Sequence, residues 1–371
     1  MIDTFDAVIV GGGIVGAACA LAFSKAGMRV ALVERDEIGG GATAAAMGSI
    51  VVLDDTPAQL ALTRYSQLLW QQMANDFPPA VEYFTRGTLW VAADDEELEE
   101  IHRKHRVYSD HGIPCEVLDA QSVSRIEPAL SPGLAGGFVV PGDVVVAPQL
   151  AAQSLLHQAK VTLVREEAAA MGSGKVRLRN GDQLLAPILV NAAGEWASVL
   201  TPGLPVAMRK GHLALTRPYP GFLRYQVAEL GYLKSAHVTT VDTVACNVQP
   251  RQNGQLLIGS SRQFGVESRA VDDTILARMF ARAAEYLPAL PELTIERTWT
   301  GFRSYTPDKL PLIGPSGEDE TLYIATGHEG LGITTSLATG QLLADHLQGK
   351  TTAIPMAPYA PSRRGRLLQQ V

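Results

Sequence analysis

Cysteine, positive charge and long apolar runs are all scarce in this sequence, and each scarcity excludes a class of protein. Three cysteines, Cys19, Cys115 and Cys246, lie far apart in 371 residues, which excludes a disulfide framework and the ligand spacing of a zinc or iron–sulfur site. The most apolar stretch, near the N-terminus, is broken by glycines and charged residues, so neither a signal peptide nor a membrane span is expected. We therefore expect a cytoplasmic protein without a metal centre.

The charge balance is mildly acidic. The chain has 31 lysines and arginines against 38 aspartates and glutamates, a formal net charge of −7, so no basic field draws it to nucleic acid. Its length predicts about two domains. Its 46% of hydrophobic residues is typical of a globular protein rather than a disordered chain. Glycine, by contrast, is abundant, with 35 residues, and the positions of these glycines are informative.

The first cluster of glycines lies between a strand and a helix near the N-terminus. Residues 6–10 form a short apolar run typical of a buried strand, and residues 14–25 have the composition of a helix. Between the strand and the helix, Gly11 permits a tight turn and Gly13 lets the backbone approach a pyrophosphate. Within the helix, Gly16 lets the helix pack closely on the strand. This pattern predicts a dinucleotide-binding site.

The same segment supplies groups for the phosphates and the ribose of a dinucleotide. The amides of Ile14 and Val15, at the start of the helix, favour phosphate groups. Residues 29–34 form a second buried strand that ends at Glu34, whose carboxylate can accept hydrogen bonds from both ribose hydroxyls and would repel a 2′-phosphate. The alternative interpretation is that Glu34 is a solvent-exposed residue at the end of the strand and binds no ligand. Arg35 is taken with Glu34 as a cofactor-binding candidate.

Two further segments are poor in large side chains. Residues 39–49 suit a backbone that packs against an extended ligand, and Thr43 offers a hydroxyl to a phosphate; the alternative is a small-residue helix packed on another helix. Residues 326–334 repeat the order of strand, glycines and helix, and the start of that helix would stabilise negative charge on a ligand. The cofactor-binding candidates from both segments are Ala42, Thr43, Gly48, Ser49, Gly327, His328, Gly330, Leu331, Gly332, Ile333 and Thr334.

The domain organisation is interleaved. Segments of dinucleotide-binding type lie at both ends and in the middle of the chain, and strands that look antiparallel lie between them. We predict an α/β fold, with a Rossmann domain interleaved with a second domain on a mixed or antiparallel sheet. The Rossmann domain takes residues 1–80, 142–205 and 300–371, and the second domain takes 81–141 and 206–299.

Five motifs, in order along the whole chain, carry a family resemblance. They are the N-terminal glycine fingerprint, Gly41-Ala42-Thr43, Asn191–Trp196, Thr300–Asp308 with Pro311–Gly314, and Gly327–Thr334. Together they resemble the D-amino acid oxidase superfamily of FAD-dependent oxidoreductases, which includes glycine oxidase and sarcosine oxidase. The resemblance implies FAD in a glutathione-reductase-like domain and a substrate domain whose sheet covers the flavin. It adds these cofactor-binding candidates: Ala168, Ala193, Gly194, Trp196 and Gly301.

The resemblance also implies how substrate and flavin are held. Arg303 matches the arginine that binds the substrate carboxylate in glycine and D-amino acid oxidases, and a planar guanidinium suits a bidentate carboxylate. The alternative for Arg303 is an ion pair with Asp308 or Glu329. Sarcosine oxidase links its flavin to a cysteine in this region, whereas this chain has none after Cys246, so we expect non-covalent FAD.

Three further polar residues are candidates for substrate contact. A second substrate-binding arginine of glycine oxidase is missing, and His328 and Glu329 occupy that neighbourhood, where they either contact substrate or support the loop. His212 begins a strand expected to face the flavin, and a structural histidine is an equal alternative. Tyr225 and Tyr232 are candidates for closing the pocket.

The resemblance implies oxidation of an amino or imino acid by hydride transfer from the Cα–H bond to flavin N5. Residues 51–55, 62–66 and 210–212 resemble the FAD subunits of bacterial D-hydroxyproline dehydrogenases, and less closely those of hydrogen cyanide synthases and opine oxidases. This implies a D-proline-type imino acid such as cis-4-hydroxy-D-proline as substrate, and small electron-transfer partner subunits. Two alternatives stay open: a glycine- or sarcosine-type oxidase that produces hydrogen peroxide, and a flavoprotein subunit that relays electrons.

Overall fold

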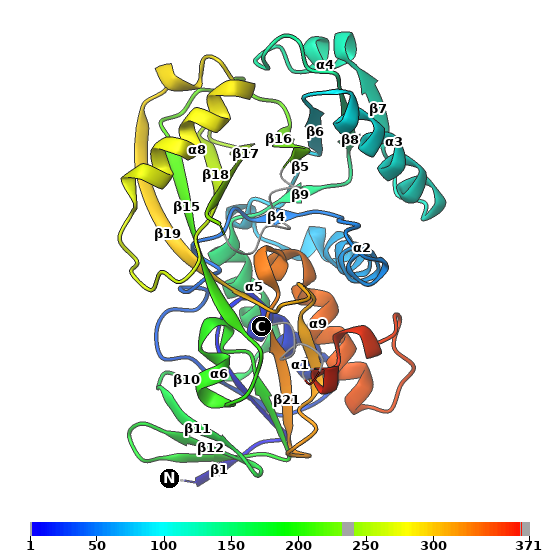
Figure 1. Cartoon of the computed structure of the whole chain (residues 1–371). Coiled ribbons are helices and arrows are strands. Elements are labelled where there is room, and N and C mark those ends of the chain that lie inside the picture. Colours follow the sequence, from blue (N-terminus) through cyan, green and yellow to red (C-terminus); the bar gives the residue numbers. More distant parts are fainter. Residues whose placement is uncertain (1, 232–240, 364, 366–371) are drawn as a thin grey trace. The chain divides into compact units, whose positions relative to one another are not determined.

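The computed structural model describes residues 2–231, 241–363 and 365 (Figure 1). The chain divides into two compact units that alternate along the sequence. Unit 1 comprises Met1–Tyr83, Val146–Met208 and Phe302–Val371, and unit 2 comprises Phe84–Val145 and Arg209–Gly301. The predicted domains alternate in the same order with boundaries a few residues away, and the roles that the sequence assigned to them stay predictions.

Unit 1 is built on a six-stranded sheet in the order β10-β3-β2-β14-β21-β20. Neighbouring strands are parallel, except that β20 runs antiparallel to β21. The strands are β10 Thr162–Val164, β3 Val30–Val33, β2 Ala7–Val10, β14 Ile188–Asn191, β21 Leu322–Thr326 and β20 Leu312–Pro315. Every residue of β2 and β3 is buried, as their apolar runs predicted. The N-terminal strand–helix–strand unit is therefore confirmed.

The helices of unit 1 pack on one another over small residues. α1 contacts α5 and α9, and α9 also contacts α2. A Cβ atom at Gly340 of α9 would lie 2.5 Å from the carbonyl oxygen of Ala18 in α1, so the two helices approach closely at this glycine. The helices are α1 Ile14–Lys25, α2 Pro57–Gln72, α5 Pro148–Ala159, α6 Ala197–Leu200 and α9 Gly332–Leu347.

Shorter elements complete unit 1. A four-stranded sheet has the order β1-β13-β12-β11, with β1 Ile2–Thr4, β13 Gln183–Leu185, β12 Lys175–Leu178 and β11 Ala168–Gly172. The other elements are β4 Ser49–Ile50 and the 3₁₀ helices η1 Ala74–Asp76, η2 Pro79–Val81, η3 Gly194–Trp196, η5 Glu329–Leu331, η6 Ala357–Tyr359 and η7 Pro361–Arg363. Residues 38–45 form successive turns, so the small-residue segment is not the helix that was its alternative.

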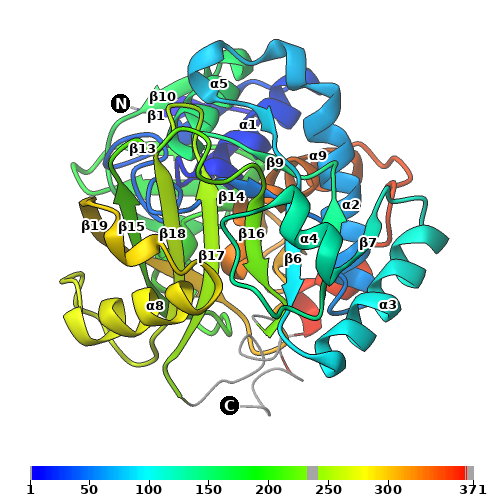
Figure 2. The same cartoon turned by 90° about the horizontal axis from the view of Figure 1, so that it is seen from above.

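Unit 2 contains a mixed eight-stranded sheet in the order β19-β15-β18-β17-β16-β6-β8-β7, whose central strands lie side by side in Figure 2. β16 and β6 are parallel, and β17 is antiparallel to both of its neighbours. The strands are β19 Ile295–Tyr305, β15 Ala207–Thr216, β18 Leu256–Arg262, β17 Thr243–Pro250, β16 Gln226–Glu229, β6 Thr88–Ala92, β8 Gly136–Val140 and β7 Glu116–Asp119.

One face of this sheet forms the core of unit 2. Apolar side chains such as Leu89, Val227 and Ile258 pack there with Met279 and Tyr286 of α8. The remaining elements of unit 2 are α3 Asp95–Asp110, α4 Ala120–Ile126, α8 Asp273–Tyr286, η4 Leu290–Glu292, β5 Phe84–Thr85 and β9 Val144–Val145. The predicted mixed sheet is confirmed.

Helix starts follow the capping signals in the sequence. Asp94 caps α3 by accepting a hydrogen bond of 2.9 Å from the amide of Glu97, and Asp119 caps α4 in the same way from Ser122 at 2.7 Å. Among the described helices, none is long and apolar enough to cross a membrane, and no described cluster of His, Cys, Asp and Glu could hold a metal ion.

Candidate functional site

The turn between β2 and α1 can be made only by glycine at two positions. Gly11 has a φ of +113°, and a Cβ there would lie 2.4 Å from the carbonyl oxygen of Ala192. A Cβ at Gly16 would lie 1.9 Å from the carbonyl oxygen of Gly11. α1 starts at Ile14 and its N-cap residue is Gly13, which has no side chain to cap the first amides. The start of α1 therefore leaves backbone donors available for a phosphate.

Thr43 lies against this helix start, as the sequence predicted for a phosphate-binding hydroxyl. Its Oγ1 accepts a hydrogen bond of 3.0 Å from the amide of Ile14, and the side chain is buried. The Ile14 amide is therefore engaged, while the hydroxyl proton of Thr43 can still be donated to an anion. Gly48, at the end of this segment, has a φ of +88°, and a Cβ there would lie 2.1 Å from the carbonyl oxygen of Val146.

Glu34 is held beside the glycine turn. One carboxylate oxygen accepts a hydrogen bond of 2.6 Å from the amide of Gly12, and the other accepts one of 2.8 Å from the amide of Asp36. The side chain is half-buried, which argues against the alternative of a freely solvated strand end. A carboxylate can accept further hydrogen bonds, so this position suits a ribose diol.

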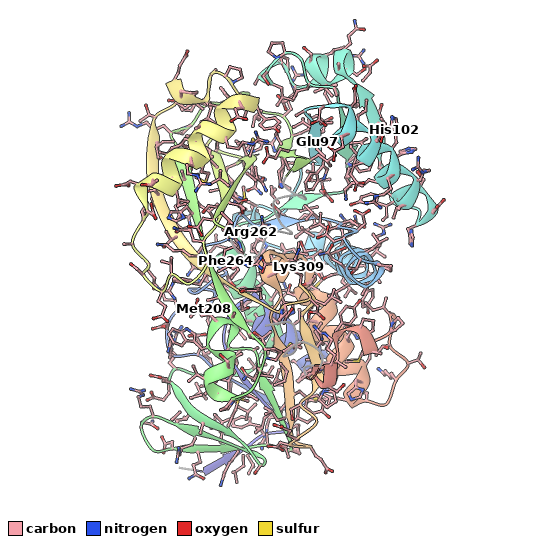
Figure 3. The ribbon with its side chains drawn as sticks, viewed as in Figure 1. Glu97, His102, Met208, Arg262, Phe264 and Lys309 are labelled. Atoms are coloured by element: carbon pink, nitrogen blue, oxygen red, sulfur yellow. The ribbon has the colours of Figure 1, made fainter. Side chains whose placement is uncertain are left out.

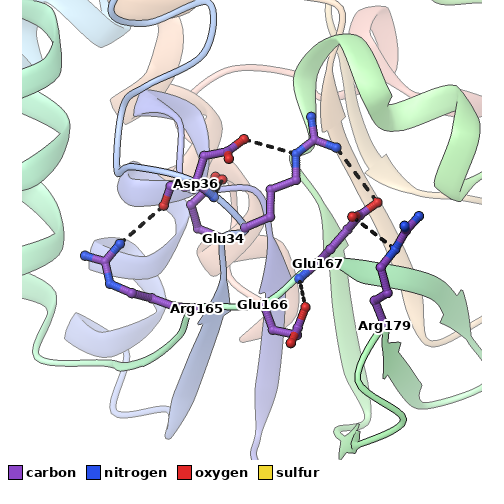
Figure 4. Close-up of polar contacts among 8 residues, drawn as sticks. Glu34, Asp36, Arg165, Glu166, Glu167 and Arg179 are labelled. Carbon is purple, nitrogen blue, oxygen red and sulfur yellow. Dashed lines mark hydrogen bonds and ion pairs between the residues drawn. The ribbon is translucent and has the colours of Figure 1, made fainter.

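Arg35 and Trp196 meet next to Glu34. The Arg35 guanidinium lies 4.6 Å from the centre of the Trp196 ring, and its Nη1 lies 3.9 Å from Glu167. Figure 4 shows the surrounding network, in which Glu167 also pairs with Arg179 at 3.1 Å. Trp196 is 43% exposed, so its ring can stack on an added aromatic group. Ala168, by contrast, lies in β11 of the small sheet and packs, partly buried, against an apolar core cluster of unit 1.

The end of β14 and the second glycine segment also lie together. The hydroxyl of Thr326, at the end of β21, donates a hydrogen bond of 3.0 Å to the carbonyl oxygen of Gly194 in η3. Thr334 of α9 donates to the carbonyl oxygen of Ser49 at 3.1 Å and accepts from the amide of Val51 at 3.2 Å. Thus segments far apart in the sequence converge at the start of α9. The same region contains the predicted residues Ala193, Gly327, Leu331, Gly332 and Ile333.

Arg303, on β19, lies beside this helix start. A Cβ at Gly330 of η5 would be 3.7 Å from its Nε atom. The alternative partner Asp308 is occupied by Arg363, with 2.8 Å between Nε of Arg363 and Oδ2 of Asp308. The Arg363 side chain of this ion pair is only 9% exposed.

The turn after Arg303 is tightly bonded. The Thr306 hydroxyl donates a hydrogen bond of 2.7 Å to the carbonyl oxygen of Leu310, and Oδ1 of Asp308 lies 3.0 Å from the same hydroxyl. Lys309, labelled in Figure 3, has a φ of +62° within it. The turn packs on Gly327, where a Cβ would lie 2.8 Å from Thr306. The strand that carries Arg303 is thereby fixed to the second glycine segment.

His328 is a buried neutral side chain. Its Nε2 lies 3.0 Å from the hydroxyl of Thr339, and that hydroxyl already donates to the carbonyl oxygen of Thr335 at 2.9 Å. Nε2 must therefore carry the hydrogen that is donated to Thr339. Burial lowers the pKa of His328 from 6.5 to about 3, so the ring is uncharged at neutral pH. These contacts favour support of the loop over substrate contact. Glu329, with a φ of +53°, begins η5.

His212 is buried in unit 2 with both ring nitrogens engaged. The amide of Asp272, the N-cap of α8, donates to Nε2 at 3.0 Å, and Nδ1 lies 2.9 Å from the hydroxyl of Ser261. His212 is on the same side of β15 as Ala214, which belongs to the core under α8. This geometry favours the structural alternative. Tyr225 is half-buried against that core, and Tyr232 lies outside the described residues.

The opposite face of the unit 2 sheet carries polar side chains that the sequence did not single out. Gln249 donates a hydrogen bond of 3.2 Å to Gln226 on the neighbouring strand. Within the described part of the chain, Oγ1 of Thr88 and Oδ1 of Asn247 are buried without a hydrogen-bond partner. A buried polar atom without a partner costs about 1–3 kcal/mol, so these atoms are candidates for ligand or water contact. Alternation of polar and apolar residues along 246–249 was the available signal.

The comparisons with known proteins match this arrangement over nearly the whole chain. The model of the family described as "FAD dependent oxidoreductase" matches residues 6–346. The chain belongs to this family. A glycine oxidase of Geobacillus kaustophilus is 29% identical over 387 residues, covering 98% of each chain. The hydrogen cyanide synthase subunit HcnC of Pseudomonas aeruginosa is 28% identical over 423 residues, covering 97% of this chain and 96% of that one.

Two solved structures show the same fold. The crystal structure of glycine oxidase from Geobacillus kaustophilus superposes with a TM-score of 0.87 at 27% identity, covering 97% of this chain and 99% of that one. The L-proline dehydrogenase from P. horikoshii superposes with a TM-score of 0.88 at 24% identity, covering 99% of both chains, which shows likeness of fold. The predicted fold class and the predicted cofactor, FAD, are thereby confirmed.

The described residues fit FAD. The start of α1, whose N-cap residue Gly13 has no side chain, suits a pyrophosphate; Glu34 suits the ribose and the exposed Trp196 ring suits the adenine. A Cβ at Gly13 would meet only Thr43 Oγ1, at 3.4 Å, so the backbone there is open to close approach by a ligand. The start of α9 has no side-chain cap either, which suits an acceptor oxygen on the flavin ring.

Proposed function

We propose that this FAD-dependent oxidoreductase is a dehydrogenase of amino or imino acids, and that its substrate is a D-proline-type imino acid such as cis-4-hydroxy-D-proline. The observation that carries the proposal is the position of Arg303 beside the start of α9. A carboxylate is the natural partner of such a guanidinium. In support, curated relatives include glycine oxidases and a D-amino acid dehydrogenase.

In this proposal FAD is held by unit 1 without a covalent bond. The amides at the start of α1, the Thr43 hydroxyl and the Glu34 carboxylate would bind its dinucleotide part, and Arg35 with Trp196 would flank the adenine. Burial raises the pKa of the Cys19 thiol to about 12 and also raises that of Cys246, so neither thiol is available as a nucleophile.

The chain's own residues would position the substrate. The Arg303 guanidinium would bind the carboxylate through two hydrogen bonds and so fix the Cα–H bond in one orientation. Bound FAD would accept the hydrogen and its bonding electron pair from Cα as a hydride. A C=N bond then forms as the amine nitrogen contributes its lone pair, so the amine must have lost its ammonium proton to solvent beforehand. His328 is an unsuitable base, because its Nε2–H is committed to Thr339.

Two other functions are favoured by specific relatives. The glycine oxidases favour an oxidase that passes electrons to oxygen and forms hydrogen peroxide. The HcnC relatives, each named as a subunit, favour a flavoprotein that works with small electron-transfer partner subunits. In the second case this chain could relay electrons without oxidising the substrate itself.

A substrate panel tests the proposal and separates the alternatives. The holoenzyme is mixed without oxygen with D-proline, cis-4-hydroxy-D-proline, glycine and sarcosine, and the flavin absorbance is followed. Fast bleaching by the cyclic D-imino acids, followed by turnover with an artificial dye and slow peroxide formation in air, supports the proposal. Fast peroxide formation identifies an oxidase. Failure of every amino and imino acid to bleach the flavin contradicts the proposal and favours a relay subunit.

A further inference from the structure

Neither the backbone conformation nor the packing around residue 330 requires a glycine at this position. A Cβ built there would lie 3.7 Å from Nε and 3.8 Å from Cδ of Arg303, and no other described atom beyond its chain neighbours lies within 4 Å. These are ordinary van der Waals distances, and the φ of Gly330 is not in the left-handed region. Gly16 and Gly340 differ, because a Cβ at either would collide with backbone. The consequence of glycine at 330 is therefore space beside the guanidinium.

In the proposed function, this space would border the substituents of a bound substrate. A carboxylate held by Arg303 would place Cα just beyond the carboxylate carbon, so the groups on Cα and the amine nitrogen would lie on its flank, within the reach of one side chain at residue 330. Glycine as substrate carries nothing more there. In a cyclic imino acid the ring joins Cα to the nitrogen, so its methylene groups need room on the flank of the carboxylate group. A side chain at residue 330 would occupy part of that room.

We infer that Gly330 determines substrate size, because it leaves the flank of the Arg303 guanidinium open to the ring of a cyclic amino acid. The inference rests on the proposed function for the role of Arg303 as the carboxylate-binding group. It goes beyond that function in naming a residue that would separate cyclic from acyclic substrates. Gly330 need not contact the substrate itself, because the effect comes from the side chain that glycine lacks.

Binding of inert carboxylates to the oxidised holoenzyme tests the inference without turnover. Pyrrole-2-carboxylate is the ring probe and acetate is the small probe, each titrated while the flavin absorbance is followed. For Gly330→Val we expect the Kd of pyrrole-2-carboxylate to rise about tenfold or more, as overpacking would require, with less than about a threefold change for acetate. Gly330→Ala is expected to give a smaller change in the same direction. Gly365→Ala, exposed and without neighbours within 4 Å, is the matched control.

The outcomes distinguish failure of the inference from failure of the proposed function. Equal weakening of both probes in Gly330→Val at normal flavin content, no change for either, or no binding of either probe to wild type overturns the inference. Selective loss of the ring probe supports the inference even if no amino or imino acid bleaches the flavin, in which case only the proposed function fails. Equal oxidation of cis-4-hydroxy-D-proline by wild type and Gly330→Val would sustain the proposed function and overturn the inference.

Discussion

Glu34 shows how a single side chain is prepared for a ligand. Its carboxylate is already fixed by two backbone amides, those of Gly12 and Asp36, so little side-chain freedom is left to lose when a ribose binds. The identity of this residue was predictable because it follows a glycine fingerprint at the end of the next strand. The hydrogen bond from the Gly12 amide to Glu34 was not predictable, because the sequence does not show which amide a carboxylate will contact.

Replacement of Glu34 tests its role in FAD binding. Glu34→Ala should raise the Kd of FAD for the apoprotein about 10- to 100-fold, since charge-assisted hydrogen bonds to the ribose would be lost. Fluorescence quenching of added FAD measures this Kd. Glu37→Ala, which removes an exposed carboxylate of the same loop, should leave it within about twofold of wild type. Equal Kd values for Glu34→Ala and wild type would exclude Glu34 from the cofactor site.

The burial of His328 predicts how the free energy of unfolding depends on pH. Its pKa is about 3 when folded and 6.5 as a free side chain, so between these pH values the unfolded chain binds more protons. The stability that neutral His328 contributes is therefore present above pH 6.5 and is lost as the pH falls toward 3. His328→Asn should show a smaller loss of unfolding free energy between pH 7.5 and pH 5 than wild type, measured by urea denaturation.

His346, an exposed histidine on α9, provides the control for that experiment. His346→Asn should keep the wild-type dependence of stability on pH. If His328→Asn and wild type lose the same unfolding free energy over this range, His328 is not the buried neutral group that the structure describes.

At the scale of elements, local signals in the sequence predicted starts and ends well. α1 has the predicted bounds, and α3 and α4 begin directly after Asp94 and Asp119, a residue type that the sequence alone marks as a common helix cap. Pairings between distant residues were not predictable. The Arg363–Asp308 ion pair and the Thr334–Ser49 hydrogen bond join segments whose proximity depends on the tertiary fold. The short alternation around Asn247 is visible in the sequence, but the strand register was needed to show that Thr88 and Asn247 lie on the face opposite α8.

The packing of α1 against α9 can be tested directly by a substitution at the contact. Gly340→Ala places a methyl group 2.5 Å from the carbonyl oxygen of Ala18, so one helix must shift. Such overpacking should lower the free energy of unfolding by about 1–3 kcal/mol. Gly41→Ala, in a turn with no neighbour within 4 Å, is the control and should change it by less than about 0.5 kcal/mol. Unchanged stability of Gly340→Ala, measured by denaturant unfolding, would contradict the close helix packing.

At the scale of the whole molecule, the interleaving of two units was predictable because dinucleotide-type segments recur at the ends and in the middle of the chain. The roles of the units are testable by hydrogen–deuterium exchange. Addition of FAD to the apoprotein should protect residues 11–16, 39–49 and 327–334, all in unit 1. The core of unit 2 under α8 should change much less. Protection confined to unit 2 would contradict the assignment of FAD to unit 1.

The central claim is that Arg303 anchors the carboxylate of an amino or imino acid that the enzyme oxidises. Anaerobic flavin bleaching by cis-4-hydroxy-D-proline, compared between wild type and Arg303→Ala at equal flavin content, tests it most directly. The account predicts that Arg303→Ala needs roughly 30- to 1,000-fold more substrate for half-maximal bleaching, because a charge-paired contact is removed. Bleaching of both proteins at the same substrate concentrations would contradict it.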